Sequence, residues 1–301
     1  MTLYTQVAAN RFKTALFLSI YVLIILVLGY AISYYYNSPD ILLIAGVISI
    51  VQGAVSYWSS DKVALAVSRA VPLDPRQYAS VYTLVQNLSI TAGLPIPRLY
   101  LLNYDAINAF ATGRDPKNAA IAITRGSLTR LNENELQGVL AHELSHVGNE
   151  DIRLTSMVMV MAGLIALVSD LFLRSLWWGG GRRSNRDNNG GDSGPILLLI
   201  AVALSILAPI AATLIQLAIS RKRELMADAN GVLITRYPEG LISALRKIGG
   251  DQEPLAEANR ATAHMYFSNP LKGGGFATLF DTHPPIAQRI AALQKGSGII
   301  E

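Results

Sequence analysis

Two of the four histidines in this chain of 301 residues, His142 and His146, lie four positions apart, with Glu143 directly after the first. On a helix, residues four apart lie on one face, so both imidazole rings can reach a single ion. Glu143 would then project toward a water molecule beside that ion, from which its carboxylate can take a proton. The chain has no cysteine, which leaves His, Asp and Glu as metal ligands. This spacing predicts half of a zinc site that activates water, rather than an ordinary helix with two exposed histidines.

A catalytic zinc ion usually has three protein ligands, so a third donor must come from elsewhere in the chain. In the stretch SRKRELMADANG, residues 220–231, Glu224 and Asp228 lie one helical turn apart. We expect Glu224 to complete a His, His, Glu set. We expect Asp228 to accept the outer ring proton of a ligand histidine and so fix its tautomer. The alternative is that Glu224 pairs with Arg221 or Lys222 on a solvated helix face.

The composition indicates a membrane protein, because 51% of the residues are hydrophobic and only 15% are charged. Four apolar stretches approach or exceed the roughly 20 helical residues that a hydrocarbon core needs: Thr14–Tyr36, Ile41–Trp58, Ser156–Leu173 and Pro195–Ile219. We therefore predict four transmembrane helices arranged as two hairpins. Two alternatives remain: the first stretch as a removable signal peptide, and the last two as a buried helical hairpin of a soluble protein.

The predicted organisation alternates membrane and polar segments. It consists of an N-terminal transmembrane hairpin (1–59), a polar segment that ends in the histidine helix (60–154), a second hairpin with a Gly- and Arg-rich linker at 177–194 (155–219), and a second polar segment (220–301). Two crossings return the chain to the same side, so the polar segments should pack as one domain around the site. Within the first we expect a helix over 70–95, a small antiparallel sheet, and a helix over 132–154. The predicted fold class is α+β and mainly helical.

The net charge of +4 is small, and the basic residues are scattered or lie beside apolar stretches. This pattern fits a lipid bilayer as partner and excludes nucleic acid. Basic residues near the membrane ends on the side of the site predict that this side is the cytoplasm: Arg11, Lys13, Lys62, Arg69, Arg153, Arg221, Lys222 and Arg223. Three linker arginines, Arg182, Arg183 and Arg186, are a contrary signal. We expect a multi-pass protein of the cell membrane with its site facing the cytoplasm.

Four ordered motifs resemble the HtpX family of membrane-bound zinc metalloproteases, relatives of the CAAX prenyl endopeptidases: NAFATG (108–113), HELSHVGNED (142–151), SRKRELMAD (220–228) and THPPIAQRI (282–290). The likeness runs from about Leu73 to Leu293. It implies a gluzincin-type domain that holds one Zn²⁺ on His142, His146 and Glu224, with Glu143 as general base. It also implies that the edge strand containing Asn108 and Phe110 aligns the substrate backbone, and that His283 helps to stabilise the oxyanion. The substrates implied are misfolded or damaged membrane proteins, cut at the cytoplasmic face.

Several of these assignments have alternatives in the residues themselves. NAFATG alone predicts only a strand that ends in a glycine turn, and His283 can simply begin a helix before two prolines. We expect His264 to be a packed or surface histidine rather than a fourth ligand. Two other functions stay open. One is a narrower processing protease of the prenyl-peptidase type, and the other is a non-enzymatic membrane scaffold with structural zinc, which would favour four protein ligands.

Overall fold

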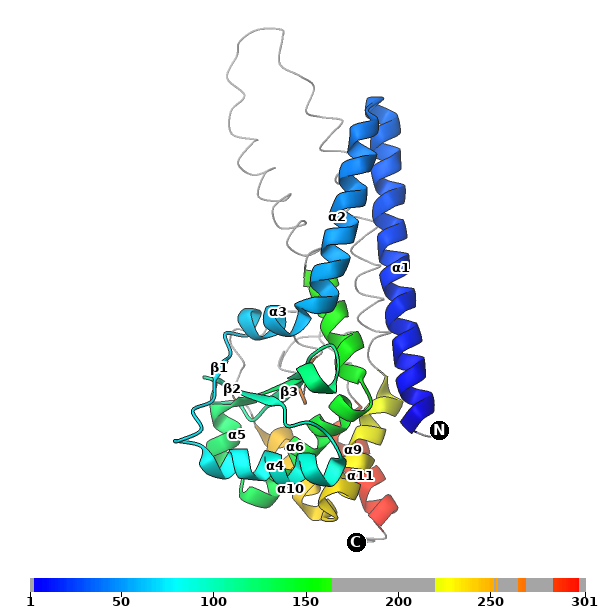
Figure 1. The fold of residues 1–301 in the computed structure, drawn as a ribbon. Coiled ribbons are helices and arrows are strands. Elements are labelled where there is room, and N and C mark those ends of the chain that lie inside the picture. The colour runs from blue at the N-terminus through cyan, green and yellow to red at the C-terminus, as the bar shows by residue number, and fades with distance from the viewer. Residues whose placement is uncertain (1–2, 164–219, 252, 254–264, 269–283, 298–301) are drawn as a thin grey trace, which may run out of the picture.

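A long helical hairpin projects from the remainder of the chain in the computed structural model, which describes residues 3–163, 220–251, 253, 265–268 and 284–297 (Figure 1). Its two helices are α1 (Leu3–Tyr36) and α2 (Pro39–Trp58). Between them Asn37 adopts a left-handed φ of 48°, which asparagine tolerates better than most residues. Pro39 begins α2 at a position where its missing N–H costs no hydrogen bond.

Both hairpin helices are long and apolar enough to cross a membrane, over Val7–Val27 and Pro39–Trp58. They cross in close contact, because a Cβ added at Gly29 would overlap the Cβ of Ala45. Large apolar side chains cover the outer surface of the hairpin, which suits hydrocarbon better than water: Phe12, Leu23, Val27, Leu43, Ile44 and Ile50. Two of the four predicted spans thus correspond to helices that could cross a membrane. The rest of the third beyond residue 163, the fourth, and the linker 177–194 lie outside the described residues.

A four-stranded sheet lies at one end of the hairpin, with the strand order β1-β2-β4-β3. The strands are β1 (Val71–Pro72), β2 (Arg98–Leu102), β3 (Ala109–Thr112) and β4 (Ala120–Thr124). The prediction of an antiparallel sheet was wrong in part. β1 pairs with β2 and β3 pairs with β4 antiparallel, but β2 and β4 are parallel.

The parallel pair arises from the order in which the chain fills the sheet. After β2 the chain passes the neighbouring position and forms β3 at the edge. It then returns through a short 3-10 turn (Pro116–Asn118) and inserts β4 between the two. Asp115 stabilises this return, since its carboxylate accepts from the backbone N–H and the side-chain amide of Asn118. Alternating apolar residues predict strands but do not reveal this insertion.

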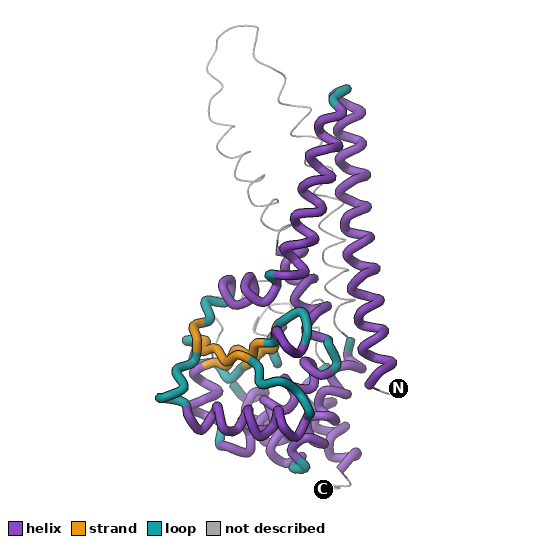
Figure 2. Tube along the Cα trace, in the orientation of Figure 1, coloured by secondary structure: helices purple, strands orange, loops and turns teal. Residues whose placement is uncertain are grey.

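Helices surround the sheet and form most of the domain, as Figure 2 shows. They are α3 (Ser60–Val67), α4 (Ala79–Ala92), α5 (Arg125–Arg130), α6 (Glu133–Gly148), α9 (Arg221–Thr235), α10 (Pro238–Gly250) and α11 (Ile286–Ser297). The helix predicted over 70–95 is therefore only α4, which ends at left-handed Gly93. The helix predicted over 132–154 is interrupted after Gly148, and a new helix runs over 151–163.

The histidine helix α6 lies in the middle of the domain. Asn132 caps its start, and Glu135 completes a reciprocal capping box with Asn132. Its apolar side chains share one core with α4, the sheet, α9, α10 and α11, so described parts of both polar segments contribute to one hydrophobic interior. The exact segment boundaries proposed from the sequence remain predictions.

Candidate metal centre

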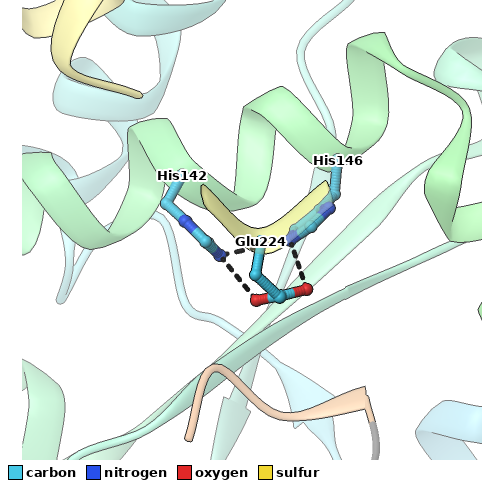
Figure 3. A group of neighbouring side chains, drawn as sticks. All are labelled: His142, His146 and Glu224. Carbon is cyan, nitrogen blue, oxygen red and sulfur yellow. Dashed lines mark hydrogen bonds and ion pairs between the residues drawn. The ribbon is translucent and has the colours of Figure 1, made fainter. Parts of the chain in front are cut away.

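His142 and His146 lie on one face of α6, and their Nε2 atoms are 3.1 Å apart. The two rings meet edge to face, with centroids 4.7 Å apart. Figure 3 shows both rings directed at one point beside the helix. This is the arrangement that the four-residue spacing predicts.

Glu224 approaches the same point from α9 (Figure 3). Its Oε2 lies 3.7 Å from Nε2 of His142, and its Oε1 lies 3.5 Å from Nε2 of His146. The absence of a side chain at Gly231 allows α9 to lie this close to α6, because a Cβ there would be 3.0 Å from the backbone nitrogen of His142. The alternative of a solvated Glu224 is thereby excluded, since this residue is buried.

The donor set and its spacing fit a tetrahedral zinc ion. An ion with bonds of about 2.0–2.1 Å separates its ligand atoms by roughly 3.3–3.4 Å. The two Nε2 atoms are 3.1 Å apart, Oε2 of Glu224 lies 3.7 Å from that of His142, and Oε1 lies 3.5 Å from that of His146. One ligand atom from each residue lies within 4.8 Å of the other two. Two imidazoles and one carboxylate are the ligand types of a catalytic zinc site with an open fourth position.

Asp228 lies on the outer side of His142, as the sequence predicts for a carboxylate that fixes a ligand's tautomer. Its Oδ1 is 2.9 Å from Nδ1 of His142. Arg289 from α11 binds the same carboxylate through two nitrogens, at 2.6 and 2.8 Å. Burial raises the pKa of Asp228, but the charges and hydrogen bonds of Arg289 and His142 together outweigh it and lower that pKa to about 2. Asp228 therefore stays a carboxylate and accepts the Nδ1 proton of His142.

Aromatic packing completes the surroundings of His142. The ring of Phe267 lies edge to face against His142, with centroids 4.7 Å apart, and the guanidinium of Arg289 lies 4.3 Å from the centre of that same ring. Arg289 also donates to the backbone oxygen of Phe267. The buried arginine is thus fixed by a carboxylate, a carbonyl and an aromatic face.

His146 has its own carboxylate partner, Asp151, whose Oδ2 is 3.0 Å from Nδ1 of His146. Asp151 lies five positions after His146, which does not correspond to one face of a continuous helix. It reaches the ring because α6 ends at Gly148 and Glu150 turns the chain back with a φ of 55°. The sequence interpretation missed this residue, although it is in the quoted motif HELSHVGNED.

The two histidines carry different charges before a metal binds. Burial lowers the pKa of His142 to about 4. Burial also acts on His146, but the charges of Glu224 and Asp151 outweigh it and raise its pKa to about 9. At neutral pH the Nε2–H of His146 therefore donates to Nε2 of His142. A metal ion bound between the two Nε2 atoms would displace this proton.

The remaining predicted site residues occupy different positions. Glu143 is buried on α6, close enough to His146 and Arg289 to raise the pKa of both.

Phe110 is on β3, an edge strand of the sheet, and Asn108 is the residue immediately before that strand. Both side chains are buried. Asn108 donates to the backbone oxygen of Ser268, and Phe110 packs against Tyr266. His283 and His264 lie outside the described residues.

A family model for peptidase family M48 matches residues 75–297, which include every residue of this centre. The chain belongs to peptidase family M48. The resemblance inferred from four motifs is thereby confirmed, and the chain is a metallopeptidase. Arg289 and Asp151, which the sequence interpretation did not single out, lie inside the matched region.

Curated M48 relatives extend over nearly the whole chain. A protein named Protease HtpX homolog from Caldanaerobacter subterraneus subsp. tengcongensis is 46% identical over 295 residues, covering 97% of each chain. One of the same name from Streptococcus gordonii is 39% identical over 295 residues, covering 97% of this chain and 99% of that one. Among solved structures, Ste24p of S. mikatae has a similar fold, with a TM-score of 0.51 and 18% identity. That match covers 89% of this chain and 62% of the longer Ste24p chain.

Proposed function

We propose that this M48 peptidase is a membrane-anchored zinc endopeptidase that cleaves misfolded or damaged membrane proteins at the cytoplasmic face of the cell membrane. The observation that carries the catalytic part is the convergence of His142, His146 and Glu224, whose ligand atoms lie within 4.8 Å of one another. The relatives named Protease HtpX homolog support a proteolytic role, and the two helices long and apolar enough to cross a membrane support the membrane anchor.

His142, His146 and Glu224 would hold one Zn²⁺. The ion would supply Lewis acidity, which polarises a substrate carbonyl and acidifies water. Glu143 would be the general base, because it adjoins a ligand without belonging to the converging set and is buried beside it. It would take a proton from the attacking water and deliver it to the leaving amine. Asp228 and Asp151 would keep both histidines in the tautomer whose Nε2 is free for the ion.

The edge strand β3 is the proposed site for substrate alignment through main-chain hydrogen bonds. Its partner β4 covers one edge, and the backbone N–H of Phe267 already donates to the oxygen of Ala109 on the other. The side chains of Asn108 and Phe110 would act from the interior, since Asn108 holds the neighbouring segment at Ser268 and Phe110 anchors the strand. They would therefore support the strand rather than contact the peptide.

The proposed oxyanion role of His283 rests on its place in the chain. Arg289, six residues later, reaches Asp228 and His142. Helix α11, which begins three residues after His283, therefore carries a side chain that reaches the metal centre. A positively polarised imidazole there would stabilise a developing oxyanion.

Substitution of Glu143 by Gln tests catalysis apart from metal binding. Glu143→Gln keeps the size of the side chain and removes the base, so peptide cleavage by purified full-length protein should fall about 10²- to 10⁴-fold. The zinc content should remain one per chain. The matched control is Glu133→Gln, the same change at an exposed position of the same helix, which should keep wild-type cleavage. A Glu143→Gln protein that holds zinc and cleaves at the wild-type rate would show that Glu143 is not the base.

The cytoplasmic orientation can be tested with single cysteines, because the chain has none of its own. Asp40 is exposed at the far end of the hairpin, and Arg76 is exposed on the domain. In intact cells a membrane-impermeant thiol reagent should label Asp40→Cys and not Arg76→Cys. The reverse pattern would place the peptidase domain outside the cytoplasm.

A further inference from the structure

Asn10, in the third turn of α1, is a buried amide in a helix whose later residues are almost all apolar. Its Nδ2 donates to Oδ1 of Asp151 at 2.7 Å and to the backbone oxygen of Asn149 at 3.0 Å. Asn149 is in the short connection after α6, and Asp151 is the first residue of the helix that follows it. An apolar side chain at this position would leave these acceptors without their donor.

The two oxygens of Asp151 have separate roles. Oδ1 accepts from Asn10, while Oδ2 is the atom 3.0 Å from Nδ1 of His146. The carboxylate therefore cannot rotate toward one partner without losing the other. A continuous chain of hydrogen bonds runs from α1 through Asp151 to a proposed metal ligand.

Two arginines hold the same connection from either side. Arg11, the next residue of α1, binds both carboxylate oxygens of Glu150, at 2.9 and 2.5 Å. Arg223 of α9 lies 3.6 Å from Oδ1 of Asp151 and 3.4 Å from Oδ1 of Asn10. Glu150 itself is in the left-handed region and buried, and its carboxylate is bound by Arg153 as well as by Arg11.

From these contacts we propose that Asn10 is a positioning residue for His146, so that docking of the first transmembrane helix completes the metal centre. The inference rests on the proposed function in one respect, namely that His146 binds the metal. It goes further because it makes metal affinity depend on a residue of the membrane hairpin. Loss of the Asn10 amide would let Asp151 turn, and the imidazole of His146 would lose its fixed orientation.

The test measures the dissociation constant of Zn²⁺ by chelator competition on purified full-length protein. Asn10→Ala should bind Zn²⁺ about tenfold more weakly, at the low end of the effect of removing a partner behind a metal ligand. The control is Arg11→Gln, which alters the adjacent contact with the same connection. Its affinity should stay at the wild-type value, because Arg11 is largely exposed and Glu150 retains Arg153. The absorption spectrum of bound Co²⁺ should change in Asn10→Ala and not in Arg11→Gln.

A second set of variants distinguishes the positioning of His146 from a purely structural effect. Asn10→Asp places a second carboxylate against Asp151 and should weaken Zn²⁺ binding more than Asn10→Ala does. Adding Asp151→Asn restores a donor and acceptor pair, so the double variant should bind more tightly than Asn10→Asp alone. The inference is overturned if all Asn10 variants bind Zn²⁺ as Arg11→Gln does, or if the second change gives no rescue. A wild-type protein that binds no Zn²⁺ would instead defeat the proposed function.

Discussion

His142 and His146 make the same hydrogen bond to a carboxylate, at 2.9 and 3.0 Å, but different regions of the molecule hold those carboxylates. Asp228, behind His142, belongs to a buried ion pair with Arg289, and both side chains are only 1% exposed. Asp151, behind His146, is held by Asn10 of the membrane hairpin and lies beside Arg223. The side chain of His146 is 15% exposed, against 1% for His142.

His142 is therefore a fixed ligand, whereas His146 is an adjustable one. The His142 side is assembled entirely from α6, α9, α11 and Phe267, deep inside the peptidase domain. The His146 side is assembled where that domain meets α1. Disturbing the first should therefore lower the stability of the domain more than disturbing the second, which should weaken the metal centre with little loss of stability.

The largest expected effect is the loss of stability when the buried arginine is removed. Arg289→Gln leaves the carboxylate of Asp228 buried without its cation, which should lower the free energy of unfolding by about 3–5 kcal/mol. Arg223→Gln is the matched change on the other side. It should cost less than Arg289→Gln does, because Arg223 lies 3.6 Å from Asp151 and that carboxylate keeps its hydrogen bond from Asn10. Denaturant unfolding of the metal-free proteins measures both, and equal losses would contradict the difference between the two sides.

The next prediction concerns metal affinity and compares Asp228→Asn with Asp151→Asn. In each variant the amide oxygen can still accept the histidine proton, but the negative charge is lost. Asp228→Asn should weaken Zn²⁺ binding about 100-fold, because the unpaired Arg289, 3.4 Å from His142, then opposes a divalent cation. Asp151→Asn should weaken it about tenfold, or about 1.4 kcal/mol. A chelator competition in which Asp151→Asn is the weaker binder would reverse the proposed ranking.

Helical spacing was sufficient to predict the inner part of this centre. His142 and His146 share a face because they are four apart, and Glu224 and Asp228 share a face for the same reason. Hydropathy likewise predicted the hairpin of α1 and α2. In each case the information is local, since the period of a single element decides which residues lie together.

Features that depend on contacts between elements could not be predicted in this way. Asp151 reaches His146 only through the turn at Glu150, and Arg289 reaches Asp228 from α11. Asn10 meets Asp151 across 141 positions of the chain. The parallel pairing of β2 and β4 was missed for the same reason, because insertion of a strand leaves no periodic signal.

The smallest expected effect belongs to another buried carboxylate, that of Glu135 on the histidine helix, which touches neither histidine ligand. It accepts from Asn132, Ser243 and Lys247 at the start of α6. Burial raises the pKa of Glu135, but the hydrogen bonds of Lys247 and Ser243 outweigh it and lower that pKa below its ordinary value. The carboxylate therefore stabilises the fold in its charged form.

Glu135→Gln should lower the free energy of unfolding at pH 7 by about 1 kcal/mol, because it removes the charge that Lys247 faces and keeps the amide oxygen as an acceptor. A lowered folded-state pKa gives stability that is present above the unfolded value of about 4.3 and is lost as the pH falls through the folded value. The wild type and the variant should thus converge in unfolding free energy below about pH 4. Zn²⁺ affinity should be equal in the two proteins at pH 7. A weaker affinity in Glu135→Gln would contradict this. It would mean that the start of α6, as well as Asp228 and Asp151, positions the two histidine ligands.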